Sequence, residues 1–163
     1  MIKKFLTLFS TLAVVSMLAA CGGDKAPQVD YVTIQGQTIT PADYQGQVML
    51  VNFWATSCTT CVKEMPDIVD THNKFKDQGF RTIAVAMSYD RPDYVVNFAE
   101  TRKLPFDVAL DVNGNIAKAF DDVKITPTTY VINRKGEIIK TYVGEPDFAA
   151  LHALIEKSLA EKV

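Results

Sequence analysis

The pattern of apolar and polar positions predicts strands that alternate with helices. Two nearly continuous apolar runs, 48–54 and 80–88, are rich in residues that favour strands, which is typical of strands buried on both faces of a sheet. Between them, residues 59–78 place apolar side chains every three or four positions, and Gly79 follows, which predicts an amphipathic helix that ends there. Together these segments predict a β-α-β unit with a right-handed crossover.

The rest of the chain repeats this alternation. It predicts helices at 91–103, 115–122 and 147–162, a short strand at 106–111, and two strands around a glycine-containing turn at 128–144. The order β-α-β-α-β-α-β-β-α predicts an α/β fold with a largely parallel sheet, an antiparallel hairpin at its edge and helices on both faces. We find no repeat and no internal linker, so we expect one domain.

The N-terminal residues have a different pattern. Lys3 and Lys4 precede an apolar run at 5–20, which is shorter than the roughly 20 residues that span a bilayer. A basic start, a short apolar middle and small residues at the end are typical of a secretory signal peptide, so we expect residues 1–20 to be removed. We expect residues 21–29 to form a tether, which is flexible because it lacks apolar periodicity.

The end of the apolar run, Leu18 to Cys21, resembles the bacterial lipobox, at which a signal peptide is cut before a cysteine that carries a diacylglycerol. The alternative is an ordinary cleavage site that leaves Cys21 as a free thiol. We favour lipidation because an odd cysteine on an exported chain needs an explanation. Acyl chains on Cys21 would hold the protein at a membrane, facing the periplasm or the cell exterior.

The charge of the chain argues against one class of partner. The whole chain has a formal charge of −2, and removal of two lysines with the signal peptide leaves −4. Nucleic acid requires a clustered basic face, which this mild acidity does not supply. We therefore expect no nucleic-acid partner, and we expect a monomer.

The two remaining cysteines, Cys58 and Cys61, lie three positions apart between a predicted strand and a predicted helix. Such a pair can serve as half a zinc site, as a structural bond or as a redox couple. Structural zinc needs four ligands, and His72 and His152 lie on apolar helix faces without the spacing of a second pair. A disulfide across two residues constrains the unfolded chain very little. We therefore favour redox chemistry, with no metal and no cofactor beyond the Cys58–Cys61 disulfide.

The place of the pair at a helix start supports this use. The first N–H groups of a helix have no partner within it, and their partial positive charge favours a thiolate. Cysteines in such positions have pKa values of ~3.5–7.5, against about 8.5 for a free cysteine. We predict that Cys58 is the exposed nucleophile and that Cys61, one turn deeper, resolves the mixed disulfide that Cys58 forms with a partner.

The segments VNFWATSCTTC (51–61) and ITPTTYVI (125–132) resemble thioredoxin. More narrowly, residues 30–163 are similar to the TlpA/ResA-like thiol–disulfide oxidoreductases, which are tethered to membranes and face outward. The predicted helix and strand at 91–111 match an insertion of that subgroup. The resemblance implies a thioredoxin-like fold over 30–163, with a central mixed sheet flanked by helices, and an enzyme that acts on extracytoplasmic protein disulfides.

The resemblance also implies roles for single residues. Cys58 and Cys61 match the redox pair, and Pro127 matches a cis-proline that faces the pair. A cis bond there would leave the Thr126 backbone exposed, so that it could pair with an extended substrate strand. Trp54 matches a tryptophan that lines the site, and the alternative is an ordinary core aromatic.

Glu64, three positions after Cys61, matches a glutamate that manages protons in the ResA-like subgroup. If this carboxyl is half-buried, its pKa is raised and it can accept the proton of Cys61; the alternative is an exposed helix glutamate. Asn52 stands where thioredoxin has an acid, which leaves Glu64 as the candidate for proton transfer. Ser57 stands where the family usually has a tryptophan, so the resemblance does not determine the reduction potential or the partner.

The favoured function is reduction of selected protein disulfides, as in apocytochrome c maturation, with a membrane electron donor of the CcdA/DsbD type by family analogy. The same residues would serve oxidation or isomerisation. The direction depends on the difference in reduction potential between the enzyme and its partner, and a difference of 30 mV is only about 1.4 kcal/mol. One alternative is a peroxiredoxin-like antioxidant, although Ala55 stands where those enzymes place a threonine. Another is a copper-binding assembly lipoprotein with Cys58 and Cys61 as Cu(I) ligands.

Overall fold

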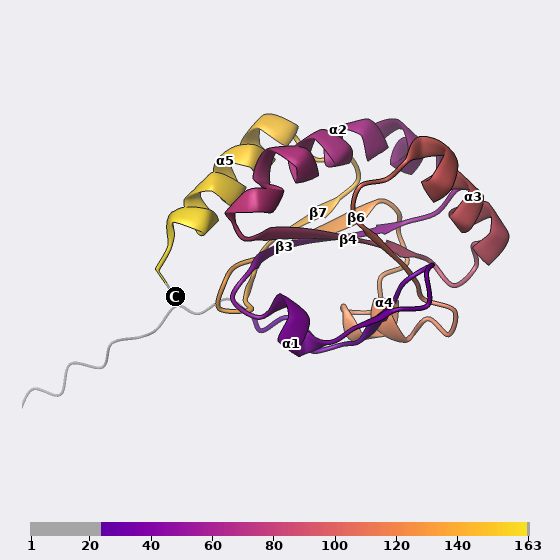
Figure 1. Cartoon of the computed structure of the whole chain (residues 1–163), viewed down its shortest axis with the longest axis horizontal. Helices are drawn as coiled ribbons and strands as arrows, with labels where there is room; N and C mark the ends of the chain where they lie inside the picture. Colours follow the sequence, from indigo (N-terminus) through magenta and orange to yellow (C-terminus); the bar gives the residue numbers. More distant parts are fainter. Residues whose placement is uncertain (1–23, 163) are drawn as a thin grey trace, which may run out of the picture.

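The computed structural model describes residues 24–162, so the predicted signal peptide and Cys21 lie outside the described residues (Figure 1). Its elements are β1 (Tyr31–Val32), β2 (Thr38–Ile39), α1 (Pro41–Tyr44), β3 (Val48–Trp54), α2 (Thr59–Phe75), the short 3-10 helix η1 (Lys76–Gln78), β4 (Phe80–Ala86), α3 (Pro92–Arg102), β5 (Asp107–Leu110), α4 (Asn115–Ala119), β6 (Thr128–Ile132), β7 (Ile138–Val143) and α5 (Phe148–Ala160). Each strand and helix predicted from residue 48 onward is present, although α4 is shorter than predicted.

A five-stranded sheet forms the centre of the domain, with the strand order β5-β4-β3-β6-β7. β3, β4 and β5 are parallel, whereas β6 is antiparallel to β3 and β7 is antiparallel to β6. The sheet is therefore mixed, as the resemblance implied. The predicted insertion supplies α3 and the edge strand β5.

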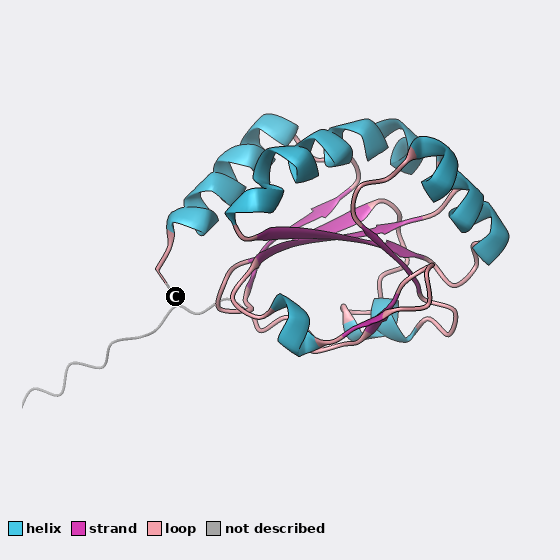
Figure 2. Cartoon of the chain, in the orientation of Figure 1, coloured by secondary structure: helices cyan, strands magenta, loops and turns pink. Residues whose placement is uncertain are grey.

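Helices cover the two faces of the sheet unequally. The long helices α2, α3 and α5 lie on one face, and the short α1 and α4 lie on the other (Figures 1 and 2). Under the long helices, Ile68 of α2 and Leu151 of α5 are fully buried against the sheet. On the other face, the rings of Phe53, Phe120 and Tyr130 pack edge to face. The two faces thus have separate apolar cores, which is typical of a layered α/β domain.

The N-terminal part of the domain differs from the prediction. The sequence pattern indicated no element before residue 48, but the structure has the β1–β2 pair and α1 there. Each of these strands has two residues and α1 has four, so neither alternation nor helical periodicity can develop along them.

The predicted flexible tether is also corrected from Asp24 onward. The Ala26 N–H donates to the Gly136 carbonyl at 2.9 Å, and the Ile138 N–H donates to the Asp24 carbonyl at 2.8 Å. These bonds dock the segment against the turn between β6 and β7. That turn lies at the end of the sheet where β3 begins, because Met49 pairs with Ile132.

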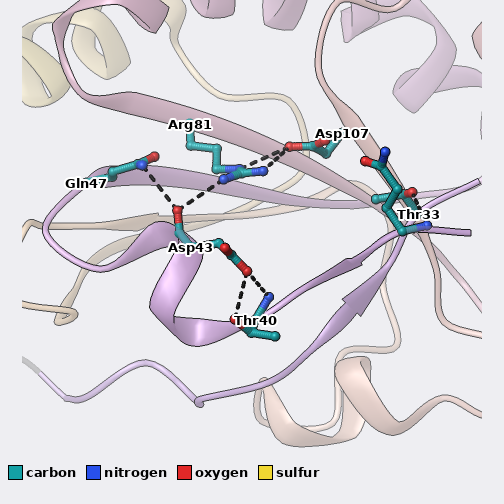
Figure 3. A network of polar contacts seen from close by, with 7 residues as sticks. Thr33, Thr40, Asp43, Gln47, Arg81 and Asp107 are labelled. Atoms are coloured by element: carbon teal, nitrogen blue, oxygen red, sulfur yellow. Dashed lines mark hydrogen bonds and ion pairs between the residues drawn. The ribbon is translucent and has the colours of Figure 1, made fainter. Parts of the chain in front are cut away.

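A polar network fastens α1 to the edge of the sheet (Figure 3). Arg81 of β4 donates to Asp107 Oδ2 through Nε and Nη2, at 3.0 and 2.8 Å, and its Nη1 donates to the Asp43 carbonyl at 3.2 Å. The Asp43 carboxylate accepts from the backbone N–H and the hydroxyl of Thr40, both at 2.7 Å. The side chains of Arg81 and Asp107 are only 24% and 32% exposed, so this pair is less screened by water than a surface pair.

Substitution R81M is expected to lower the free energy of unfolding by about 1–2 kcal/mol, because it leaves the Asp107 carboxylate without its donor and removes one of the two side-chain donors to the Asp43 carbonyl, the other being Gln47 Nε2. The matched control is R91M, since the ion pair of Arg91 with Asp93 is 65% and 59% exposed. We expect its effect to stay below about 0.5 kcal/mol. Urea denaturation of both variants measures this difference, and equal losses would contradict the role given to the network.

Candidate active site

The redox pair lies where β3 passes into α2. A tight turn follows the strand and is closed by the Cys58 N–H, which donates to the Ala55 carbonyl at 3.1 Å. Cys58 is the residue immediately before the first helical turn, and its carbonyl accepts from the Val62 N–H at 3.0 Å. Cys58 and Cys61 form a disulfide, with their Cα atoms 5.3 Å apart. The end of a buried strand and the start of a helix therefore fix the position of both sulfurs.

The two cysteines have different environments. Cys58 is partly exposed, whereas Cys61 is fully buried. The backbone N–H of Cys61 donates to Cys58 Sγ at 3.2 Å, so the helix directs one of its unpaired N–H groups at this sulfur. In the reduced enzyme, that N–H and the positive end of the helix dipole would stabilise a thiolate on Cys58. This difference is compatible with attack by Cys58 and resolution by Cys61.

Trp54 does not line a substrate surface in this structure. Its side chain is fully buried in a cluster that includes Cys61 and Met65, and its ring packs on Phe98 with centroids 5.0 Å apart. It lies at the end of β3, so its place is beneath the disulfide. Trp54 is therefore an ordinary aromatic residue of the core. The prediction that it contacts substrate does not agree with this burial.

The Thr126–Pro127 peptide bond is cis. β6 begins at the next residue, Thr128, which pairs with Phe53 near the end of β3, so this bond lies at the same edge of the sheet as the cysteines. Pro127 is buried, and its carbonyl accepts from the Gly144 N–H at 2.8 Å. The Thr126 backbone N–H and carbonyl, by contrast, have no hydrogen bond within the described part of the chain. An extended polypeptide could pair with them.

The loop between β4 and α3, which the sequence analysis did not single out, contacts both halves of the site. The Asp90 carboxylate accepts from the backbone N–H of Thr56, in the turn before Cys58, and from its hydroxyl at 2.7 Å. The Tyr89 hydroxyl lies 3.3 Å from Thr126 Oγ1. No local pattern marks these residues, because they meet only where the parallel strands β3 and β4 end side by side.

Glu64 is fully buried, so it is not an exposed helix glutamate. Its Oε1 accepts a hydrogen bond from Asn52 Nδ2 at 3.0 Å, and the same Nδ2 donates to Thr129 Oγ1 at 2.9 Å. Burial raises the pKa of Glu64 to about 7; the Asn52 hydrogen bond acts to lower the pKa, and the negative charges of Glu145 and Asp67 act to raise it. A carboxyl with a pKa near neutrality can both take and release a proton.

Exposed apolar side chains belong to several segments at this edge. Four of them are between 59% and 66% exposed: Tyr89 after β4, Val112 after β5, Ile125 before β6 and Val143 at the end of β7. Apolar side chains on a surface commonly mark a site of protein contact. A hollow of about 630 Å³ lies at the opposite edge, beside the N-terminal segment, and does not include the cysteines.

The two histidines, the possible metal ligands and the helix lengths complete the description of the domain. His72 packs against Phe106 and His152 against Phe75, so both histidines are part of apolar packing, as predicted. Within residues 24–162, no group of three or more histidine, cysteine, aspartate or glutamate side chains could hold a metal ion. No helix in that range is long and apolar enough to cross a membrane.

Comparisons with known proteins agree with this geometry. The Redoxin family matches residues 22–155. The chain is 32% identical over 136 residues to the thiol–disulfide oxidoreductase ResA of Bacillus thuringiensis subsp. konkukian, a match that covers 83% of this chain and 77% of the relative. Among solved structures, it resembles a protein of Neisseria meningitidis described as a thioredoxin, with a TM-score of 0.77, 41% identity and coverage of 83% and 90%.

It also resembles a thiol:disulfide interchange protein of the thioredoxin family from Chlorobium tepidum, with a TM-score of 0.77, 25% identity and coverage of 85% of this chain and 97% of that one. The thioredoxin-like fold, the disulfide at the start of α2 and these relatives point to one assignment. The chain belongs to the Redoxin family, in which it is a thiol–disulfide oxidoreductase of the TlpA/ResA-like group.

Proposed function

We propose that the enzyme reduces disulfides of proteins outside the cytoplasm, with Cys58 as nucleophile, Cys61 as resolving thiol and Glu64 as proton acceptor. The observation that carries this proposal is the partly exposed residue Cys58 at the start of α2, at the same end of the sheet as the unpaired Thr126 backbone. A substrate strand paired with Thr126 would be held at the sheet edge where Cys58 lies.

The reaction proceeds by two exchanges. The Cys58 thiolate attacks one sulfur of the substrate disulfide, and the other substrate sulfur leaves as a thiolate that takes a proton from water. Cys61 then gives its proton to Glu64, and its sulfur attacks Cys58 Sγ, which releases the second substrate sulfur as a thiolate that also takes a proton from water. The substrate gains two electrons and two protons in total, and the enzyme ends with the Cys58–Cys61 disulfide, the form that the structure contains.

Substrate binding uses the same edge of the sheet. The unpaired Thr126 backbone supplies main-chain hydrogen bonds that do not depend on sequence. The exposed side chains of Tyr89, Ile125 and Val143 supply apolar contact on the segments around it. This combination suits an extended or unfolded protein segment better than a small molecule.

The reducing direction, the role in apocytochrome c maturation and a membrane donor of the CcdA/DsbD type are proposed from the family resemblance. So are removal of residues 1–20 and lipidation of Cys21, both of which concern residues outside the described range. With the Cys21 sulfur bound to lipid, Cys58 and Cys61 would be the chain's remaining thiols. No specific observation favours the copper-binding or the peroxiredoxin-like alternative.

Substitution C58S is expected to abolish reduction of insulin disulfides with dithiothreitol as electron source, because it removes the attacking sulfur. C61S should still attack and then stop at the mixed disulfide, which mass spectrometry of non-reduced cell extracts would identify together with the partner. C21S in the mature domain serves as the control and should retain full turnover. Full activity of C58S, or an absence of mixed disulfides with C61S, would refute the assigned roles.

The raised pKa of Glu64 predicts how stability depends on pH. Its value rises from the ordinary 4.5 to about 7 in the folded protein, so between these values the folded state keeps a proton that the unfolded chain has lost. The contribution of Glu64 to the free energy of unfolding should therefore be fully present below about pH 4.5, fall as the pH rises to about 7, and be absent above it. The fall should be on the order of 2–3 kcal/mol.

Substitution E64Q should remove this fall, because glutamine does not titrate. Urea denaturation of the oxidised protein at pH 5 and pH 8 measures the effect. E156Q is the matched control, since Glu156 is 56% exposed on α5 and pairs with the surface residue Lys74. If E64Q keeps the pH dependence of the parent, Glu64 is not the group responsible.

Lipidation predicts that the full-length chain incorporates labelled palmitate and is recovered with the membranes of a bacterial host. C21S should lose the label and move to the soluble fraction, whereas C58S should keep both properties. A parent chain that takes up no label would contradict the proposed anchor.

A further inference from the structure

We infer that Asn52 is a positioning residue for proton transfer: with Thr129, it fixes Oε1 of Glu64 and leaves Oε2 as the oxygen that receives the proton of Cys61. This inference rests on the proposed function, in which Glu64 accepts that proton. It adds two residues that no family motif assigned, and it assigns the proton to a particular atom.

The Asn52 amide is locked by its two hydrogen bonds. Nδ2 has two hydrogens, of which one is donated to Glu64 Oε1 at 3.0 Å and the other to Thr129 Oγ1 at 2.9 Å. Asn52 and Thr129 are directly paired across β3 and β6, so the backbone of the sheet fixes their spacing. All three side chains are at most 1% exposed, and water therefore does not compete for these bonds. The network joins α2, β3 and β6.

The two oxygens of Glu64 are therefore inequivalent. Oε1 faces a permanent donor, whereas Oε2 is buried without a hydrogen-bond partner among the described residues. A buried oxygen without a donor cannot hold negative charge at low cost, so it is the oxygen that carries the proton in the neutral acid. Glu64 follows Cys61 by three positions on α2, so the two buried side chains lie on the same side of the helix.

Charged groups around Glu64 act in the opposite direction to Asn52. Asp67 on α2 and Glu145 in the segment after β7 disfavour a second negative charge, and Lys63 is bound to Glu145 at 2.9 Å on the surface. The strands β3 and β6 present only the neutral Asn52 and Thr129. The Asn52 N–H is thus the group that favours the ionised form, and it keeps the carboxylate available as a base near neutral pH.

The proton balance of the resolving step follows from this arrangement. The S–H bond of Cys61 breaks as an O–H bond forms on Oε2 of Glu64, and the freed electron pair on sulfur forms the bond to Cys58 Sγ. The substrate sulfur leaves with the electron pair of the bond that it shared with Cys58. When a thiol donor reduces the enzyme again, the proton returns from Oε2 to the Cys61 thiolate.

Two measurements test the inference. Carboxyl ¹³C NMR of the oxidised protein gives the pKa of Glu64 directly. Stopped-flow mixing of the reduced enzyme with 5,5′-dithiobis(2-nitrobenzoate) releases one thionitrobenzoate when Cys58 attacks and a second when Cys61 resolves, so the pH profile of the second phase reports the base. N52A should raise the Glu64 pKa by about one unit, a tenfold gain in proton affinity, and should move the acidic limb of that profile equally.

T129V should shift the Glu64 pKa in the same direction by a smaller amount. In this variant Asn52 still donates to Glu64 Oε1, but it loses the hydrogen bond to Thr129 Oγ1 that holds its amide in place. The matched control is T82V: Thr82 is a fully buried threonine of β4 whose hydroxyl has no partner among the described residues, and its substitution should leave the Glu64 pKa unchanged. If N52A does not fold, T129V decides the question. An unmoved Glu64 pKa in the folded variants, or an equal shift in T82V, would overturn the inference.

Failure of the proposed function gives a different result. If E64Q leaves the second phase and its pH profile unchanged, Glu64 is not the base, and its proposed role falls together with this inference. If E64Q removes the pH dependence while N52A and T129V leave it in place, the role of Glu64 stands and only the positioning by Asn52 and Thr129 is wrong.

Discussion

The hydrogen bond from the Cys61 N–H to Cys58 Sγ is the interaction on which the site depends. It exists because β3 is buried along its whole length between β4 and β6, so that the chain leaves the sheet at a fixed point and starts α2 after one tight turn. A helix that began one residue earlier or later would direct its N–H groups at a different side chain. The register of the central strand therefore determines the electrostatics of the reactive sulfur.

The polar groups beneath the disulfide are unusual for the core of a sheet. Asn52, Glu64 and Thr129 are buried and bonded to one another, while Asn52 Oδ1, Glu64 Oε2 and Trp54 Nε1 have no partner among the described residues. Buried polar atoms without partners lower stability, and native proteins contain few of them. These three atoms lower the stability of the core, a cost that the proposed proton transfer by Glu64 would explain.

Sequence reasoning recovers the features that are written locally along the chain. The buried strands, the amphipathic α2, the hairpin and the place of Cys58 at a helix start all follow from periodicity and residue type. The burial of Trp54 and Glu64 could not be decided, because both residue types occur in either environment at such positions. The contacts of Asp90 with Thr56 and of Asn52 with Thr129 join distant segments, and only the register of the sheet brings them together.

The docking of the N-terminal segment on the β6–β7 turn limits how closely Cys58 can approach the membrane. That turn lies at one end of the strands and Cys58 at the other, and seven residues of β3 alone separate the two ends by roughly 20 Å. Only two residues, Gly22 and Gly23, separate the proposed lipid-bearing Cys21 from Asp24, a stretch of about 10 Å at most. The reactive sulfur would therefore stand off the bilayer at the outer tip of the domain, so an integral-membrane donor would have to extend its own thiols outward, or the whole domain would have to tip over to meet them.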